Sequence, residues 1–161
     1  MTPDAVPEDL QPVERGYRRS LMLQAAVFWI FPLIGAVVLD RLVLADSWAA
    51  GLVPLIVGFL AFGGVVLGPG RIYRRLGYAL DGRLIRIVRG WLFHVDTVVP
   101  FVRVQHIDVT RGPFDKLFGT ASLIVHTAGT HNSVVTLPGL APERASAIRD
   151  LIRAEIRADS E

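Results

Sequence analysis

The sequence of 161 residues contains no cysteine, and this absence excludes two kinds of small stabilised domain. Without thiols there is no disulfide framework and no zinc site built on thiolate ligands. A chain without cysteine also fits a reducing compartment such as the cytoplasm.

An excess of charge of one sign is missing as well. The formal net charge is +2, and every basic residue except Lys116 is an arginine. Nucleic-acid binding rests on many contacts to phosphate, so this balance gives it no electrostatic basis. We interpret the preference for arginine as a bias of genomic composition and expect no nucleic-acid partner.

Charge is almost absent from one long stretch, residues 21–67. Its formal charges are Asp40, Arg41 and Asp46, although charged residues make up 20% of the whole chain. This segregation predicts membrane spans. We expect a transmembrane helical hairpin whose spans are 21–39 and 48–67, each close to the ~20 residues that cross a bilayer. Gly64 and Gly68 form a small-xxx-small pair that permits close packing of the helices.

The flanks of the hairpin predict its orientation. Residues 1–20 form an acidic, proline-rich tail that we expect to be disordered, ending in a basic flank. The arginines on the two sides of the hairpin are Arg15, Arg18 and Arg19 before it, and Arg71, Arg74 and Arg75 after it. The positive-inside rule therefore places both termini in the cytoplasm. The alternative is a cleaved secretory signal, but its apolar region would be unusually long and a second span follows it at once.

Beyond a short basic linker, 68–75, the pattern changes to strands and predicts a cytoplasmic domain over 76–161. Asp81-Gly82 has the composition of a tight hairpin turn, and the phase of the strand near Gln105 predicts a bulge. The expected strands are 76–80, 83–89, 91–95, 97–100, 103–110, 122–127 and 133–137.

Two helices complete the expected domain. Residues 114–118 predict one helical turn whose phenylalanines fill the core. Residues 142–157 predict an amphipathic helix with one apolar face, formed by Ala145, Ile148, Leu151, Ile152 and Ile156. The expected fold is a membrane-anchored α+β protein, in which a half-open barrel of about seven strands is plugged at one end by the C-terminal helix.

Short motifs across the domain resemble the bacterial pleckstrin-homology (PH) membrane proteins of the YdbS-like group. In chain order they are Leu76-Gly77-Tyr78, Arg89-Gly90, Val99-Pro100, the run 103–109, Gly112-Pro113-Phe114, Leu117-Phe118-Gly119 and Thr127-Ala128-Gly129. The resemblance implies a PH-like β-barrel with a C-terminal capping helix, in a multi-pass protein of the bacterial inner membrane. It also implies a larger multi-span partner that carries repeated copies of the domain. The chain departs from the pattern at Thr120, where a larger apolar residue is expected.

No motif in the chain predicts catalysis, and the resemblance brings no catalytic residue with it. The spacing of the histidines, His94, His106, His126 and His131, matches no metal signature, although His106 and Asp108 share a strand face. We therefore expect no enzyme, no metal, no cofactor and no small-molecule substrate.

The sequence predicts two candidate contact sites. The first faces membrane lipids, because basic and aromatic residues flank the spans: Arg71, Arg74, Arg75, Tyr73 and Trp48. The turn at Asp81-Gly82 is too short and of the wrong charge to bind phosphoinositides as eukaryotic PH domains do. The second candidate is a partner interface at Trp91, Leu92 and Phe93, because three consecutive apolar side chains of a strand cannot all point inward.

Three functions follow from these observations. The first is a non-enzymatic protein whose PH-like domain mediates assembly at the membrane, with copies of itself or with a related multi-span subunit. The second is a sensor of anionic lipid that uses the juxtamembrane arginines. The third is an accessory subunit of a transporter, which nothing in the spans favours, since they contain no ionisable residue.

Overall fold

The computed structural model describes residues 10–90, 94–128 and 134–158. The chain divides into two compact units. Residues 21–70 form one unit, and the segment that ends at Ser20 joins the chain from Arg71 onward in the other. The residues before the hairpin thus belong to the same unit as the residues after it.

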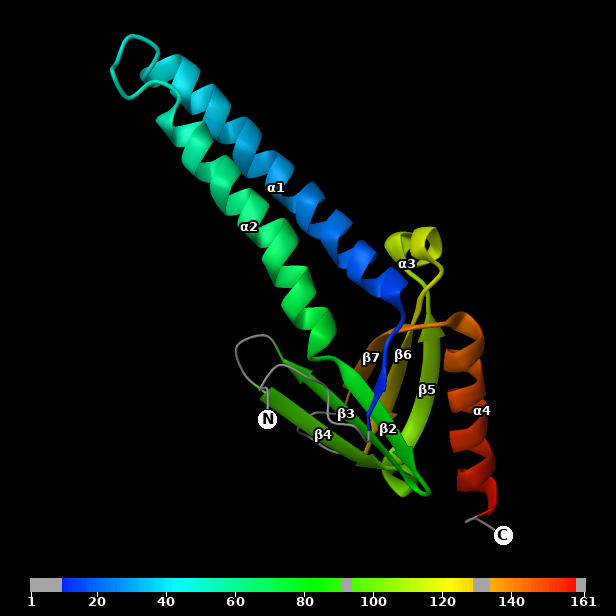
Figure 1. Cartoon of the computed structure of the whole chain (residues 1–161). Helices are drawn as coiled ribbons and strands as arrows, with labels where there is room; N and C mark the ends of the chain where they lie inside the picture. Colours follow the sequence, from blue (N-terminus) through cyan, green and yellow to red (C-terminus); the bar gives the residue numbers. More distant parts are fainter. Residues whose placement is uncertain (1–9, 91–93, 129–133, 159–161) are drawn as a thin grey trace. The chain divides into compact units, whose positions relative to one another are not determined.

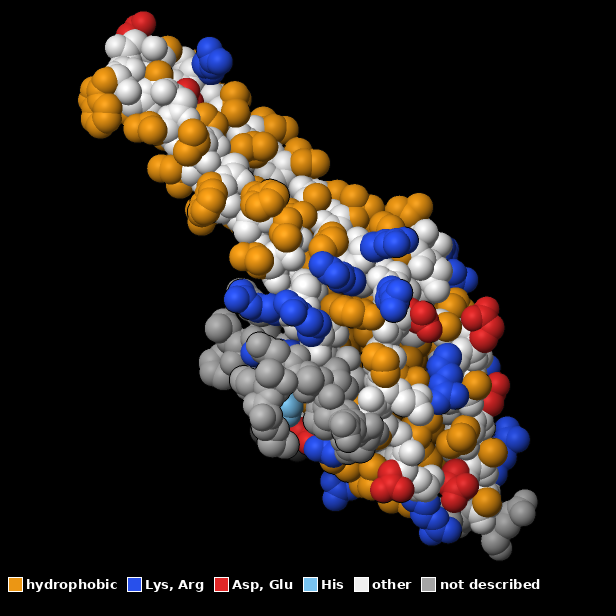
Figure 2. Space-filling view, in the orientation of Figure 1, with side chains coloured by type: hydrophobic (Ala, Val, Ile, Leu, Met, Phe, Trp, Pro, Cys, Tyr) orange, Lys and Arg blue, Asp and Glu red, His pale blue; other side chains and the backbone are white. Residues whose placement is uncertain are grey.

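The unit of residues 21–70 consists of the greater part of two long helices, α1 (Arg15–Val43) and α2 (Leu52–Arg74). Both are long and apolar enough to cross a membrane, and little of their apolar surface is buried. Figure 2 shows many hydrophobic side chains on the visible face of these helices. A soluble protein would bury such a surface in a core, so lipid is the environment that it fits.

α1 extends beyond the expected span 21–39 at both ends, whereas α2 begins and ends later than the expected span 48–67. α2 begins at Leu52, which leaves Trp48 in the connection with 92% of its surface exposed. It also runs through most of the expected linker, 68–75. Helical hydrogen bonds are local, so a helix continues past its apolar run until its residues stop it. Hydropathy marks the end of the apolar run, which need not coincide with the end of the helix.

The helix pair is joined by close packing at one glycine and by hydrogen bonds at the connection. A Cβ atom added to Gly64 would lie 2.6 Å from Nε1 of Trp29, so the helices approach closely at this glycine, whereas nothing lies within 4 Å of such an atom at Gly68. At the connection, the backbone N–H of Gly51 donates to both carboxylate oxygens of Asp40, at 2.8 and 3.0 Å. Asp40 therefore ties the last turns of α1 to the start of α2.

The other unit is built on two antiparallel sheets (Figure 1). The first has the order β1-β2-β3-β4, with β1 (Gln11–Pro12), β2 (Gly77–Asp81), β3 (Leu84–Gly90) and β4 (His94–Pro100). The second has the order β5-β6-β7, with β5 (Val104–Thr110), β6 (Ala121–Thr127) and β7 (Val134–Leu140). A 3-10 turn, η1 (Phe101–Arg103), links the sheets, and α3 (Pro113–Phe118) links β5 to β6. No strand pairing joins the two sheets among the described residues, so the expected barrel appears there as two separate sheets.

The core lies between the two sheets and the C-terminal helix, α4 (Pro142–Ala158), which packs across β5 and β6 (Figure 1). The helix buries Ala145, Ile148 and Ile152 against alternate residues of the strands. This confirms the expected helix, 142–157. Leu151 was expected on the same apolar face and is instead 48% exposed, because it lies at the rim of the buried stripe.

The strands differ from the predicted pattern in some places and agree with it in others. The bulge expected near Gln105 is confirmed by a register shift between Val104 and His106. The hairpin turn is displaced by one residue, because Asp81 still pairs with Leu84 and the turn residues are Gly82 and Arg83. The two strands expected at 91–95 and 97–100 form one strand, β4, in the described residues.

The prediction for the helical turn at 114–118 is half right. α3 forms at this position, but none of its residues is buried, so its phenylalanines do not fill the core. The hydrophobic pattern identified an apolar surface, and the topology leaves that surface outside the core.

The segment before the hairpin differs most from expectation. Within residues 1–20, expected as a disordered tail, Gln11 and Pro12 form β1, which pairs with Tyr78 and Gly77 of β2. Leu10 and Val13 on either side of β1 are buried. Proline and acidic residues give this segment the composition of a disordered chain, but its two buried apolar side chains contribute to docking it on the sheet.

Candidate functional site

The pre-hairpin segment is held to the domain by a set of specific contacts. The backbone N–H of Glu14 donates to the carbonyl oxygen of Gly139 at 2.7 Å, and Nη2 of Arg144 donates to the side-chain oxygen of Gln11 at 2.9 Å. A Cβ atom added to Gly139 would lie 2.6 Å from the ring of Tyr17. The N-terminal end of α1 is therefore packed against β7, with no space for a side chain at that glycine.

The chain that leaves the hairpin is tied to the same segment. The hydroxyl of Tyr73, in the last turn of α2, donates to the carbonyl oxygen of Val13 at 3.2 Å, and its ring packs on the edge of the core. We expected Tyr73 at the lipid interface together with Trp48. In the structure Tyr73 joins the two connections of the hairpin within the domain, and its place at the lipid interface stays a prediction.

This junction brings two groups of arginines into one unit. Arg71, Arg74 and Arg75, expected at the lipid interface, occupy the end of α2 and the residue after it, and the first two are exposed. The other group lies in the same unit, at exposed positions in the first turns of α1: Arg15, Arg18 and Arg19. From the sequence, this group served only to predict the orientation of the hairpin. Positive charge is therefore present at both connections between the domain and the hairpin.

The predicted His106–Asp108 pair is present on the outer face of β5. Nε2 of His106 lies 2.8 Å from one carboxylate oxygen of Asp108, and Nε2 of His126, from β6, lies 3.5 Å from the other. All three side chains are at least one-third exposed. No group of three His, Cys, Asp or Glu side chains among the described residues is arranged to hold a metal ion. The arrangement is a surface cluster in which two imidazole rings lie near one carboxylate.

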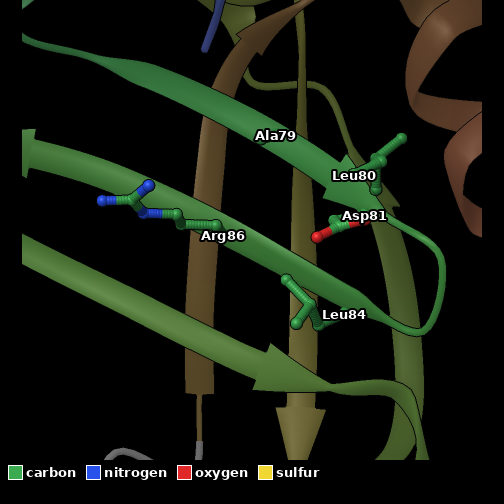
Figure 3. Close-up of a pocket in the computed structure, with 5 residues that line it drawn as sticks. All are labelled: Ala79, Leu80, Asp81, Leu84 and Arg86. Atoms are coloured by element: carbon green, nitrogen blue, oxygen red, sulfur yellow. The ribbon is translucent and has the colours of Figure 1, made fainter. Parts of the chain in front are cut away.

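A hollow of about 290 Å³ lies over the β2–β3 hairpin (Figure 3). It is lined by Ala79, Leu80, Asp81, Leu84 and Arg86. The cationic side chain that lines the hollow, Arg86, already has a carboxylate partner. Its Nε donates to both carboxylate oxygens of Asp96, at 3.0 and 2.9 Å. These hydrogen bonds lower the pKa of Asp96. The hollow therefore presents no unoccupied charge to an anionic ligand.

The expected partner interface, Trp91, Leu92 and Phe93, lies outside the described residues. The strand that follows it, β4, is the last strand of its sheet in the described order, and its second long edge pairs with no other described strand. Val95 and Val98, which point to opposite faces of the strand, are 41% and 51% exposed. An apolar strand edge of this kind is a surface that another strand can join.

The family model for the bacterial PH domain matches residues 23–156. The chain belongs to this family. A bacterial PH domain protein with these two helices is a membrane protein, and no catalytic activity is known for the family. The matched range covers most of α1, all of α2 and the strands from β2 to β7, and it begins after β1 and Tyr17.

One curated relative of this bacterial PH domain protein is the UPF0699 transmembrane protein YdbS of Bacillus subtilis (strain 168). The two are 36% identical over 75 residues, which is 47% of this chain and 45% of YdbS. The chain thus matches less than half the length of that relative. No solved structure gives a significant match.

Proposed function

We propose that this bacterial PH domain protein is a non-enzymatic assembly module of the inner membrane, which joins its partner by strand addition at β4. One observation carries the proposal: β4 is a seven-residue edge strand with exposed valines on both faces. Natural proteins usually protect such an edge with lysine, proline or a covering segment, and β4 has a proline only at its last residue, Pro100. The charged residue of β4, Asp96, faces its neighbour Arg86 and leaves the apolar positions accessible. The partner is a second copy or a related multi-span protein with PH domains.

The proposed orientation places this edge in the cytoplasm. Pairing of β1 with β2 supports it, because residues before and after the hairpin then lie on one side of the membrane. The arginines at both connections favour the cytoplasmic side.

The test uses the full-length tagged protein, extracted in mild detergent and analysed by native mass determination. We expect a defined homo-oligomer or a stoichiometric complex with a larger membrane protein. Val98→Lys should weaken it at least about tenfold, because tenfold corresponds to about 1.4 kcal/mol and a buried unpaired charge costs more than that. Val102→Lys is the matched control, since Val102 is 72% exposed but lies in η1 outside the strands. A wild-type monomer without any protein partner would refute the proposal.

A second candidate function, recognition of anionic lipid, is favoured by the two groups of arginines at the hairpin connections. Each basic residue near an anionic surface contributes about 1 kcal/mol of attraction. We expect the purified protein to retain phosphatidylglycerol over phosphatidylethanolamine, and Arg71→Gln to reduce that preference. Arg153→Gln is the control, because Arg153 is also exposed on a helix but lies on α4. Equal retention of the two lipids by the wild type would exclude this function.

A further inference from the structure

The short helix α3 combines an apolar composition with exposure to solvent. Its sequence is Pro-Phe-Asp-Lys-Leu-Phe, and none of its six residues is buried. Leu117 is 67% exposed, and Phe114 and Phe118 are only half-buried. Exposed apolar side chains that gather on one element can mark a contact with a partner or a membrane.

The acidic residue of α3 does not interrupt this surface, because its carboxylate is turned toward the protein. One oxygen of Asp115 accepts the hydroxyl of Thr120 at 2.9 Å, and the other accepts the backbone N–H of Gly112 at 3.1 Å. Thr120 is fully buried, which accounts for the polar residue at a position where a larger apolar one was expected. The carboxylate therefore bonds α3 to the residues that precede and follow it, Gly112 and Thr120.

The face that remains outside is apolar with a single cation. Pro113, Lys116 and Leu117 have the i, i+3, i+4 spacing that places side chains on one side of a helix, and all three are exposed. Lys116 is the only lysine of the chain. A lysine beside leucine and phenylalanine can lay its methylene groups on the apolar surface while its ammonium reaches polar surroundings.

Chain length sets an upper limit on the distance between α3 and the apolar run of α1. A Cβ atom added to Gly16, in the first turn of α1, would lie 2.4 Å from the carbonyl oxygen of Phe118 and 3.1 Å from Cγ2 of Thr120. α3 therefore touches the start of α1, as Figure 1 also shows. The apolar run begins only five residues later, at Leu21. Five residues reach at most ~18 Å even when fully extended. Chain connectivity alone therefore keeps α3 close to the bilayer surface.

We propose that α3 is an interfacial anchor, which inserts Leu117 and its phenylalanine neighbours between the headgroups of the leaflet next to the domain. Lys116 contacts the lipid phosphates from the same helix, as in amphipathic helices that lie in the membrane surface. The nearby exposed arginines of α1, Arg15, Arg18 and Arg19, match the negative charge of this leaflet. The anchor needs no protein partner, so it goes beyond the assembly function proposed above.

The absence of cysteine allows a direct test with one nitroxide label at a time. The full-length Leu117→Cys protein is labelled and reconstituted in vesicles of phosphatidylethanolamine and phosphatidylglycerol. Collision rates of the label with oxygen, which enriches in lipid, and with a water-soluble nickel complex then report its depth. The matched control is Leu151→Cys, a leucine 48% exposed on α4. We expect the label at position 117 to collide more with oxygen and several-fold less with nickel than the label at 151.

Two outcomes overturn the anchor. Equal nickel collision rates at the two positions would place α3 in water. A label at 117 that is shielded from both reagents, and that becomes accessible to nickel when the protein is diluted in lipid, would assign the face to a second copy of the chain. Neither outcome depends on β4, so failure of the anchor is distinguishable from failure of the assembly function.

A second experiment removes the apolar side chain and measures the accessibility of a neighbouring label. Leu117→Asp places a carboxylate where the anchor requires an apolar group, and the exposure of Leu117 means that the change leaves the core intact. We expect a nitroxide at a second α3 position, Lys116→Cys, to gain nickel accessibility in the Leu117→Asp background and not in Leu151→Asp. Unchanged accessibility in both backgrounds would contradict insertion.

Discussion

At the scale of single residues, two glycines of positive φ perform different tasks in the domain. Gly82 has a φ of +51° in the β2–β3 turn, and Gly139 has a φ of +78° in β7. Nothing lies within 4 Å of a Cβ atom built at Gly82, whereas at Gly139 that atom would meet the ring of Tyr17. Gly82 meets a requirement of the backbone, and Gly139 also provides the surface on which the start of α1 docks.

We therefore expect Gly139→Ala to destabilise the protein more than Gly82→Ala. Left-handed backbone costs an alanine about 1–2 kcal/mol at either position. Overpacking against Tyr17 adds about 1–3 kcal/mol at position 139 only. Unfolding of the two full-length variants in detergent measures the difference. Equal losses would show that Tyr17 does not rest on this glycine.

The Arg86–Asp96 pair gives stability a dependence on pH. Hydrogen bonds from Arg86 lower the pKa of Asp96 in the folded state below its ordinary value of 3.8. The stabilisation is therefore present above pH 3.8 and is lost as the pH falls below it, when the folded-state carboxylate takes up a proton. For an exposed pair we expect about 0.2–1 kcal/mol.

Comparison of the wild type with Asp96→Asn over this pH range tests the pair. The free-energy difference should be constant near neutral pH and vanish in acid. High salt should reduce it, because both side chains are accessible to solvent. A difference that persists below the pH of protonation would point to packing of the side chain instead of its charge.

At the scale of elements, the close approach of α1 and α2 depends on one glycine of the predicted pair. We expect Gly64→Ala to weaken the helix pair by about 1–3 kcal/mol, because its methyl group would overlap the Trp29 ring. Gly68→Ala has open space and should be neutral or mildly stabilising, since alanine favours the helix over glycine. Thermal unfolding in detergent compares the two variants. If both changes cost the same, helix propensity and not contact would be the cause.

Elements with internal periodicity could be predicted from the sequence, and elements without it could not. Alternating residues located the strands, and the 3.6-residue period located α4. β1 has only two residues, too few for any period, and it is stabilised by partners beyond the hairpin. The apolar residues Leu10, Val13 and Tyr17, spaced three and four apart, were the available signal.

Among the candidate sites, those marked by a local sequence pattern could be predicted, and those that depend on contacts distant in the sequence could not. Arg71 and Arg74 were found from their position after an apolar run, which is a local property. The role of Tyr73 was not predictable, because its hydroxyl bonds to Val13, which lies on the other side of the hairpin in the sequence. α3 was located correctly, but whether its apolar face points inward depends on the topology of β5 and β6, which no local pattern contains.

At the scale of the whole molecule, the membrane hairpin interrupts the domain instead of preceding it. A fragment of residues 70–161 lacks β1 and exposes the surface that Leu10 and Val13 cover. We expect this fragment to be less stable, by several kcal/mol, than one in which residues 8–20 are joined to it by a flexible linker. Chemical unfolding of both fragments, followed by circular dichroism, measures the loss. Identical unfolding midpoints would mean that the domain is complete without its first strand.

Pairing of β1 with β2 also has a consequence for biosynthesis. The ribosome releases Gln11 and Pro12 before either span, whereas Tyr78 and Gly77, with which they pair, follow both. The sheet can close only after the translocon has released two spans and returned the chain to its starting side. A chain that inserts one span alone leaves Leu10 and Val13 without their pocket. We therefore expect completion of the domain to depend on the insertion of both spans.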